Sequence, residues 1–264
     1  FCLLPAFFSL GVVSASDEVP ERLDLSNFPG EIVEKVVVPI PAEIFSVLDM
    51  LDEPEWKSAS DLPEENETTT DRAMLALTFG SVVGEGFIAV QAESAEDIEK
   101  IGRRVLSLAE SLGLSSAVRP HSLSFIEAAT NRNWEAVREE LDATQQTVRN
   151  TMEKLRDEEL SGLVSLGGWL RGTHVVTSFI SDSYSEDKAE LLNQPGLIIH
   201  FRERLEAIAA SSESNPQIRV LSTGLALLEA IISTGETITE ENINELRDIS
   251  AAMLREYYFP GVDS

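Results

Sequence analysis

The sequence predicts an all-α protein, a bundle of about eight helices in which two central glycine-rich helices run antiparallel. Apolar residues recur every three or four positions through most of the chain after Asp71, which is the period of an amphipathic helix. Residues that cap helices and residues that end them stand at the borders of these runs. Only one short segment has the composition of a β-strand, and a lone strand has no partner for its backbone. Helices that each bury an apolar face must pack on one another, so the pattern predicts a bundle.

Four parts of the chain differ in composition and predict its domain organisation. Residues 1–15 join an apolar block to small residues, which is typical of the later part of a secretory signal peptide. The alternative for this block is a buried N-terminal strand or helix. Residues 16–40 are predicted to be an extended leader, residues 41–71 a short helix and an acidic linker, and residues 72–260 the helical bundle domain.

The signal block predicts an exported protein, periplasmic or secreted, from a bacterium. The only cysteine, Cys2, lies inside this block. The mature chain is therefore expected to lack disulfides, thiolate metal sites and thiol catalysis.

The first elements are predicted to be an extended arm and a short helix. Residues 31–41 (EIVEKVVVPIP) are rich in Val and Ile but end in alternating prolines, so we expect an unpaired arm that lies on the helices. Pro41 suits the first turn of the helix that follows. That helix places four apolar side chains on one face: Ile44, Phe45, Leu48 and Leu51. In the acidic linker, Trp56 either packs against the bundle or is free to bind a partner.

The bundle helices follow in order, and each is bounded by a residue that starts or stops helices. The predicted boundaries are caps at Ser94, Asn133, Ser185 and Thr239, an end at Gly113, a break at Pro195 and a start at Pro216. The predicted helices cover residues 72–92, 95–112, 121–130, 134–157, 161–182, 186–210, 216–233 and 239–254. The tail from Tyr257 to Pro260 is apolar enough to dock back on them.

The charge balance excludes two classes of partner. The chain has 46 acidic and 20 basic residues and a formal net charge of −26. Nucleic acids and anionic lipid surfaces both bind cationic faces, so general affinity for either is excluded. A soluble, well-hydrated surface accounts for the excess of acid, and a cationic partner or a salty habitat would also suit it.

Two apolar helices carry a repeated glycine pattern. Gly80 and Gly84 in the first are matched by Gly168 and Gly172 in the second, at an offset of 88 residues. Each helix leads into another that opens with Glu-Asp, at an offset of 90 residues. Glycines four positions apart let a second helix approach closely, so we expect the two helices to pack against each other. A duplicated helical hairpin would explain the repeat.

Four residues in these two helices are candidates for ligand binding. Arg171 and Glu85 are the charges expected to be buried, because each stands beside a glycine in an apolar helix. One interpretation is an ion pair that fixes how the helices dock, because an unpaired buried charge is costly. The other is a pocket in which Arg171 binds a carboxylate or phosphate. His174, three residues after Arg171, is a base, a metal ligand or a satisfied core imidazole, and Trp169 completes the set.

No catalytic residue, cofactor or metal site is predicted. The sequence has no HExxH, CxxCH, GxSxG, phosphate-binding loop or dinucleotide-binding fingerprint. No Glu precedes a histidine by three positions, so the di-iron pattern of helical bundles is absent.

Two segments between Leu75 and Leu205 resemble those of a known family. The segments LTFGSVVGEGF and LGGWLRGTHVV are similar to those of an uncharacterised group of exported, all-helical bacterial proteins, a domain of unknown function. Members often have an acidic residue and a Tyr after the Trp-Leu pair, where this chain has Arg171 and His174. The resemblance implies export and a helical fold, and it assigns no activity.

The leading hypothesis is a non-enzymatic exported domain that binds a partner protein or a small ligand. The alternative is a hydrolase or lyase that uses Arg171, His174 and Glu85 in a cleft of the bundle. A third hypothesis is a scaffold that only oligomerises, which predicts an exposed apolar stripe. The protein is not expected to be an integral membrane protein, because charges in its apolar helices would be costly at the centre of a bilayer.

Overall fold

The computed structural model describes residues 31–33, 36–38, 41–51, 55–64, 69–155, 158–211 and 215–259. The predicted signal peptide, residues 1–15, and most of the leader lie outside these ranges. In the described residues the elements are β1 (Glu31–Val33), β2 (Val36–Val38), α1 (Pro41–Asp49), α2 (Trp56–Ala59), α3 (Arg72–Gln91), α4 (Ala95–Leu112), α5 (Ser115–Thr130), α6 (Trp134–Leu155), α7 (Glu158–Asp182), α8 (Glu186–Glu190), α9 (Pro195–Ser211), α10 (Pro216–Ile232) and α11 (Glu240–Arg255). The predicted all-α bundle is confirmed.

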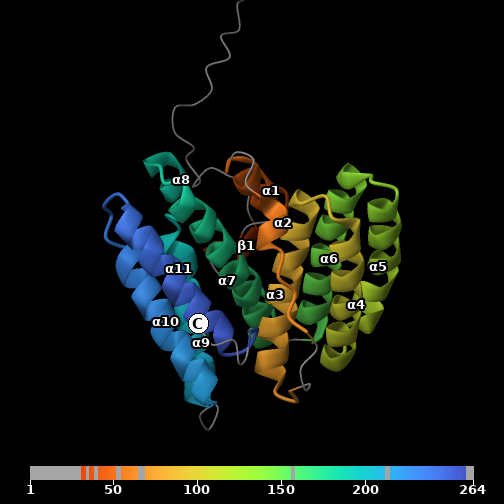
Figure 1. Cartoon of the computed structure of the whole chain (residues 1–264). Helices are drawn as coiled ribbons and strands as arrows, with labels where there is room; N and C mark the ends of the chain where they lie inside the picture. Colours follow the sequence, from red (N-terminus) through yellow and green to blue (C-terminus); the bar gives the residue numbers. More distant parts are fainter. Residues whose placement is uncertain are drawn as a thin grey trace, which may run out of the picture.

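The bundle has two halves that meet at a central pair of helices (Figure 1). One half consists of α3 to α6, in which each helix packs against the next. The other consists of α7 to α11, in which α9 packs on α10, α10 on α11, and α11 returns to α7. The most extensive contact in the molecule joins α3 to α7, which we call the seam. The two halves are therefore held together mainly by one helix from each.

The seam helices run parallel, so the predicted antiparallel arrangement is wrong. Ser81 contacts Gly167, and Glu85 contacts Arg171, so both pairs are 86 positions apart in the sequence. Residue numbers therefore rise in the same direction along both helices. The reason lies in the connections, because α4, α5 and α6 stand between α3 and α7 and the chain reverses at each turn. An odd number of intervening helices returns it in its original direction. The glycines matched in sequence thereby become neighbours in space, and Gly168 lies against Gly80.

Two glycines allow the backbones of the seam helices to touch. A Cβ atom at Gly80 would lie 1.9 Å from the carbonyl oxygen of Val164, and one at Gly167 would lie 2.1 Å from that of Leu77. No side chain fits between these backbones. Gly80, Gly84 and Gly168 of the predicted pattern thus serve close helix approach, whereas Gly172 does not.

Several boundaries predicted from the sequence are confirmed. The Ser94 side chain accepts a hydrogen bond from the Asp97 amide, and Gly113 ends α4 in the left-handed conformation with φ of 77°. Thr239 and Asn242 form a reciprocal capping box at the start of α11. Pro195 begins α9 and separates it from α8.

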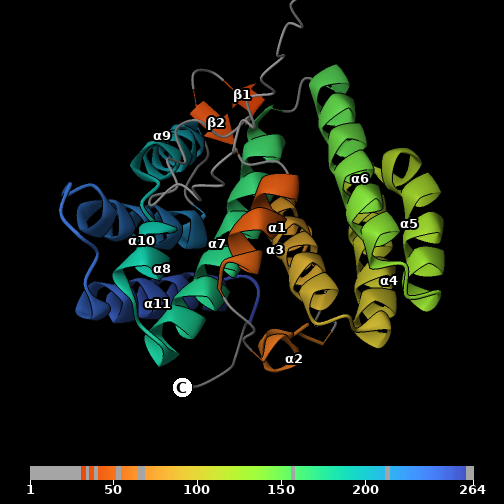
Figure 2. The same ribbon diagram turned by 90° about the horizontal axis from the view of Figure 1, so that it is seen from above.

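Two predicted elements differ in the structure. The segment from Glu31 to Val38 is not an unpaired arm, because β1 and β2 pair with each other in antiparallel register and β2 lies beside α9 (Figure 2). Helix α5 begins at Ser115 instead of residue 121 and contains Pro120. The burial of Ala117 and Val118 explains the longer helix, because their packing offsets the backbone hydrogen bond that proline cannot make.

Helix α3 is, within the described ranges, the one helix long and apolar enough to cross a membrane. Of its most apolar 18-residue window, 83% is buried inside the protein. Its one acidic residue, Glu85, has no exposed surface. The composition of α3 is therefore accounted for by its position in the centre of the bundle, where helices are apolar on all sides.

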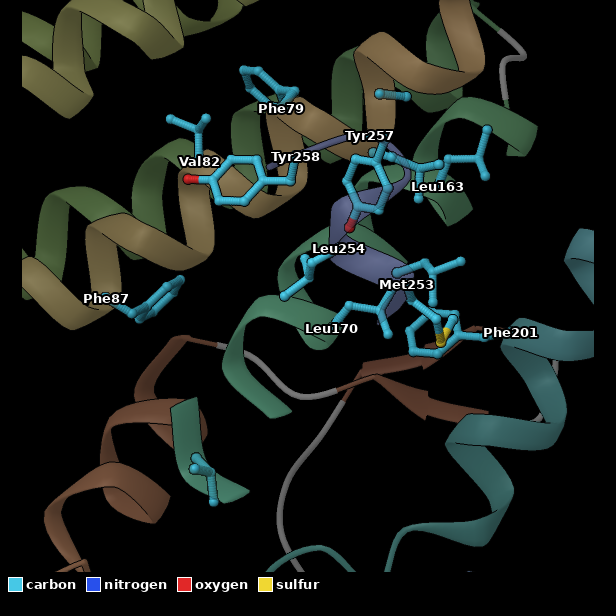
Figure 3. Close-up of a cluster of buried hydrophobic side chains, with 14 of the residues drawn as sticks. Phe79, Val82, Phe87, Leu163, Leu170, Phe201, Met253, Leu254, Tyr257 and Tyr258 are labelled. Atoms are coloured by element: carbon cyan, nitrogen blue, oxygen red, sulfur yellow. The ribbon is translucent and has the colours of Figure 1, made fainter. Parts of the chain in front are cut away.

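The C-terminal tail docks on the seam, as predicted. Figure 3 shows Tyr257 and Tyr258, just after α11, beside Phe79 and Val82 of α3. The hydroxyl of Tyr257 lies 3.0 Å from that of Ser81, which itself donates to the carbonyl oxygen of Gly167. Tyr257 must then be the donor to Ser81. The hydroxyl of Tyr258 is buried and has no hydrogen-bond partner among the described residues. Burial raises the pKa of both phenols.

The two tyrosines are expected to respond in opposite ways to loss of the hydroxyl. Tyr258→Phe should raise the free energy of unfolding by about 1 kcal/mol, because it removes a buried polar group that has no partner. Tyr257→Phe should lower it by about 1 kcal/mol, because it breaks the bond to Ser81. Urea denaturation of both variants measures the difference. A loss of stability in Tyr258→Phe equal to that in Tyr257→Phe would contradict this prediction.

Candidate functional site

The two charges predicted to be buried form an ion pair across the seam. Arg171 is 2% exposed and Glu85 is fully buried. The Nε atom of Arg171 donates to Oε2 of Glu85 at 2.5 Å, and its Nη2 atom donates to Oε1 at 3.2 Å. A planar guanidinium held on a carboxylate by two bonds has a fixed orientation. The structure thus contains the ion pair that is one of the two interpretations of these residues.

The segment that includes α2 covers this ion pair, and its backbone forms further hydrogen bonds with both charged side chains. Nη2 of Arg171 donates to the carbonyl oxygen of Ala59 at 2.6 Å, and the amide of Asp61 donates to Oε1 of Glu85 at 2.5 Å. Trp56 anchors the segment edge-on against Phe179 of α7, with ring centroids 4.9 Å apart. Trp56 therefore packs against the bundle, which was the first of its two predicted fates. The charges of the seam are thus bonded within the protein.

His174 lies one turn beyond Arg171 on α7 and is kept neutral at ordinary pH. Its Nδ1 atom is buried and has no partner in the described part of the chain. Burial lowers the pKa of the imidazole to about 4, and the charge of Arg171 contributes to the shift, while a hydrogen bond to the backbone of Arg247 opposes it. An imidazole with so low a pKa is uncharged near neutrality, which is the state of a core histidine.

His174 predicts a loss of stability in mild acid. The unfolded chain takes up a proton near pH 6.5 and the folded chain only near pH 4, so acid favours unfolding between these values. The stability present above pH 6.5 should fall by on the order of 3 kcal/mol as the pH drops to 4. His174→Gln should remove this component. Denaturant unfolding of both proteins at pH 7 and pH 4.5 provides the measurement, and equal losses in the two proteins would exclude the assignment to His174.

A large apolar cavity lies on another side of the seam. Its volume is about 640 Å³, and it is lined by residues of α1, α3, α4, α5, α6, α7, α9, the turn before α9 and the end of α10. Representative lining side chains are Val83, Phe87, Val148, Val164, Trp169 and Val176. Seam glycines also form part of its wall. Gly172 faces empty space, because a Cβ atom there would have no heavy atom within 4 Å.

Helix α1 covers the cavity between the two halves (Figure 2). Its residues Ile44 and Leu48 face the cavity. The C-terminal end of α1 is tied down by Asp49, which accepts two hydrogen bonds from Arg138 of α6, each 3.1 Å long, and one from Gln91 of α3 at 2.8 Å. The hydrogen bond from Arg138 is the main cause that lowers the pKa of Asp49. Polar contacts at its C-terminal end therefore hold α1 in place, although the face of α1 toward the cavity is apolar.

Only one of the four candidate residues predicted from the sequence lines the cavity. Trp169 lines it, whereas Arg171, Glu85 and His174 do not. The three polar candidates therefore lie together near the seam, and the cavity is built from residues that were not singled out for binding. The signal that could have found it is Gly172, a helix glycine that costs about 1 kcal/mol in helix propensity without contacting the partner helix.

Two further features bear on the functional hypotheses. No group of three or more His, Cys, Asp or Glu side chains placed to hold a metal ion occurs in the described ranges. Large exposed apolar side chains within these ranges are Leu123 on α5 and Val220 and Leu227 on α10. The scaffold hypothesis stays a prediction.

Comparison with family models, with curated proteins and with solved structures finds no match to this chain. The resemblance to exported helical bacterial proteins therefore stays a prediction that rests on the two glycine-rich segments.

Proposed function

We propose that this protein is a non-enzymatic binding protein that holds a small apolar ligand in the cavity between its two halves. The observation that carries the proposal is the cavity itself, about 640 Å³ in volume and walled mainly by aliphatic and aromatic side chains. Ligand sites in proteins are concave, mostly apolar and roughly 300–1,000 Å³ in volume. An apolar ligand would gain free energy from leaving water in proportion to the area it buries.

The arrangement of the charges also favours binding over catalysis. Arg171 and Glu85 are bonded to each other and to the backbone of residues 59 and 61. Acid-base catalysis needs a titratable group within hydrogen-bond reach of the substrate. None of the described residues that line the cavity carries an acidic, basic or imidazole side chain. The proposed role therefore requires only binding and release.

Filling the cavity tests this proposal. Gly172→Leu places a side chain in the open space beside α7 and should weaken saturable binding of the neutral fluorescent probe N-phenyl-1-naphthylamine. The fold should survive, because the substitution also improves helix propensity. Gly162→Leu is the matched control, since Gly162 lies on the same helix outside the cavity lining and its Cβ would be 3.9 Å from the Arg204 side chain.

The expected result is one binding site in the wild type and in Gly162→Leu, with at least a tenfold weaker site in Gly172→Leu. Probe binding that is equal in all three proteins would place the probe elsewhere and refute the proposal. We also propose that the protein acts after export, as a periplasmic or secreted protein that is not integral to a membrane. The apolar block at residues 1–15 supports export.

A further inference from the structure

We infer that the ligand is an uncharged amphiphile, an apolar chain that ends in an uncharged hydrogen-bonding group such as a hydroxyl or an amide. The inference rests on the proposed function and adds the class of ligand to it. Its basis is the chemistry of the cavity wall and the position of the nearest buried cation, Arg171.

The wall of the cavity is neutral, although a quarter of the residues in the chain are charged. Apart from the indole N–H of Trp169, every polar side chain among the described lining residues is a hydroxyl or an amide: Ser122, Thr144, Gln145, Ser161, Ser165, Thr173, Asn193 and Gln194. A charge that enters such a space leaves water without meeting a countercharge, which is costly. The wall therefore selects against anions and cations alike.

Arg171 does not compensate an anionic ligand. The aliphatic part of its side chain lies against Gly84, where a Cβ atom would be 3.3 Å from the Cβ of Arg171, and Gly84 is part of the cavity wall. The guanidinium, however, is directed to Glu85 and to the carbonyl oxygen of Ala59. A carboxylate in the cavity would have to compete with Glu85 for this group. The net charge of −26 adds a repulsive field for anions.

The amide and hydroxyl groups of the wall can bond an uncharged polar group of a ligand. Thr144 donates its hydroxyl proton to the carbonyl oxygen of Glu140. The side-chain amides of Asn193 and Gln194 each donate one hydrogen bond, to Glu190 and to the carbonyl oxygen of Leu191. The side-chain oxygens still offer lone pairs, and each amide keeps a second N–H. A hydroxyl or amide at the end of an apolar chain both donates and accepts, so it would match these groups.

Three ligands with the same twelve-carbon chain test the inference at pH 7.5: 1-dodecanol, dodecanoate and dodecylammonium. Each is titrated against the wild-type protein loaded with N-phenyl-1-naphthylamine, and displacement is measured by fluorescence. We expect the alcohol to displace the probe at a concentration at least about tenfold lower than either ion, a difference of about 1.4 kcal/mol. The two ions separate the effect of the wall from that of the net charge, because the field of the protein repels one and attracts the other.

Displacement by dodecanoate or by dodecylammonium that equals displacement by the alcohol would overturn the inference, since the cavity would then accept a charge. If the probe fails to bind the wild type, or binds Gly172→Leu equally well, the proposed function itself fails. Loss of probe binding in Gly172→Leu together with equal displacement by all three ligands would retain the proposed function and reject only the uncharged class.

Discussion

Replacing Gly80 with alanine is expected to lower the free energy of unfolding by about 3 kcal/mol, because the seam leaves no room for a methyl group. The new Cβ would lie 1.9 Å from the carbonyl oxygen of Val164 and 2.8 Å from its carbonyl carbon. These atoms belong to the backbone of α7, so a side-chain rotation cannot relieve the overlap. The two central helices must move apart, and the contacts along the seam are weakened together.

A glycine-to-alanine substitution at Gly172 should instead raise the free energy of unfolding. Gly172→Ala places its methyl group in open space and replaces the residue with the lower helix propensity, so we expect a gain of about 1 kcal/mol. Guanidinium denaturation followed by circular dichroism measures both variants in one experiment. If both substitutions raised stability, helix propensity alone would explain them, and the predicted close approach at Gly80 would be contradicted.

Arg171→Met is expected to lower the free energy of unfolding by about 3–5 kcal/mol, because it leaves the carboxylate of Glu85 buried without its cation. The carbonyl oxygen of Ala59 loses a donor in the same step. A methionine fills much of the volume of the arginine stem, so the cost should arise mainly from the missing charge and not from a cavity. Denaturant unfolding at pH 7 gives the magnitude.

Two controls define what the arginine contributes. The double variant Glu85→Gln, Arg171→Met removes both charges but keeps an acceptor for the amide of Asp61, and it should be more stable than Arg171→Met alone. Arg202→Met breaks partly exposed pairs with Glu206 and Glu229, and it should cost much less stability than Arg171→Met. Unchanged or raised stability in Arg171→Met would show that the ion pair does not hold the two halves together.

Local features of the fold could be predicted from the sequence because each depends on a few neighbouring residues. The caps at Ser94 and Thr239 and the end of α4 at Gly113 follow from side-chain and backbone chemistry within one turn. The direction of α7 relative to α3 could not be predicted in this way. Three intervening helices are predicted and three are present, but the direction also requires that the chain reverse at each turn, and this depends on how the helices pack.

The ion pair could be predicted from the types of its residues, whereas the cavity could not be predicted from the sequence. Arg171 and Glu85 could be matched because each is a charge in an apolar helix, and a buried charge needs a partner. The cavity arises where side chains from α1, α6 and α7 fail to meet, so it depends on the distances between helices. Gly172 contributes to it by what it lacks, so the sign of this space in the sequence is a helix glycine that the partner helix does not require.

The long sequence separation between residues that meet at the seam has a consequence for how the chain folds. Residues that meet there are 86 positions apart, whereas α3 to α6 contact their neighbours in sequence order. Contacts between distant residues carry the entropic cost of closing a long loop, and they form later than local ones. We expect each half to gain its helices first and the halves to dock afterwards. The cavity needs walls from both halves, so the capacity to bind would be the last property of the molecule to form.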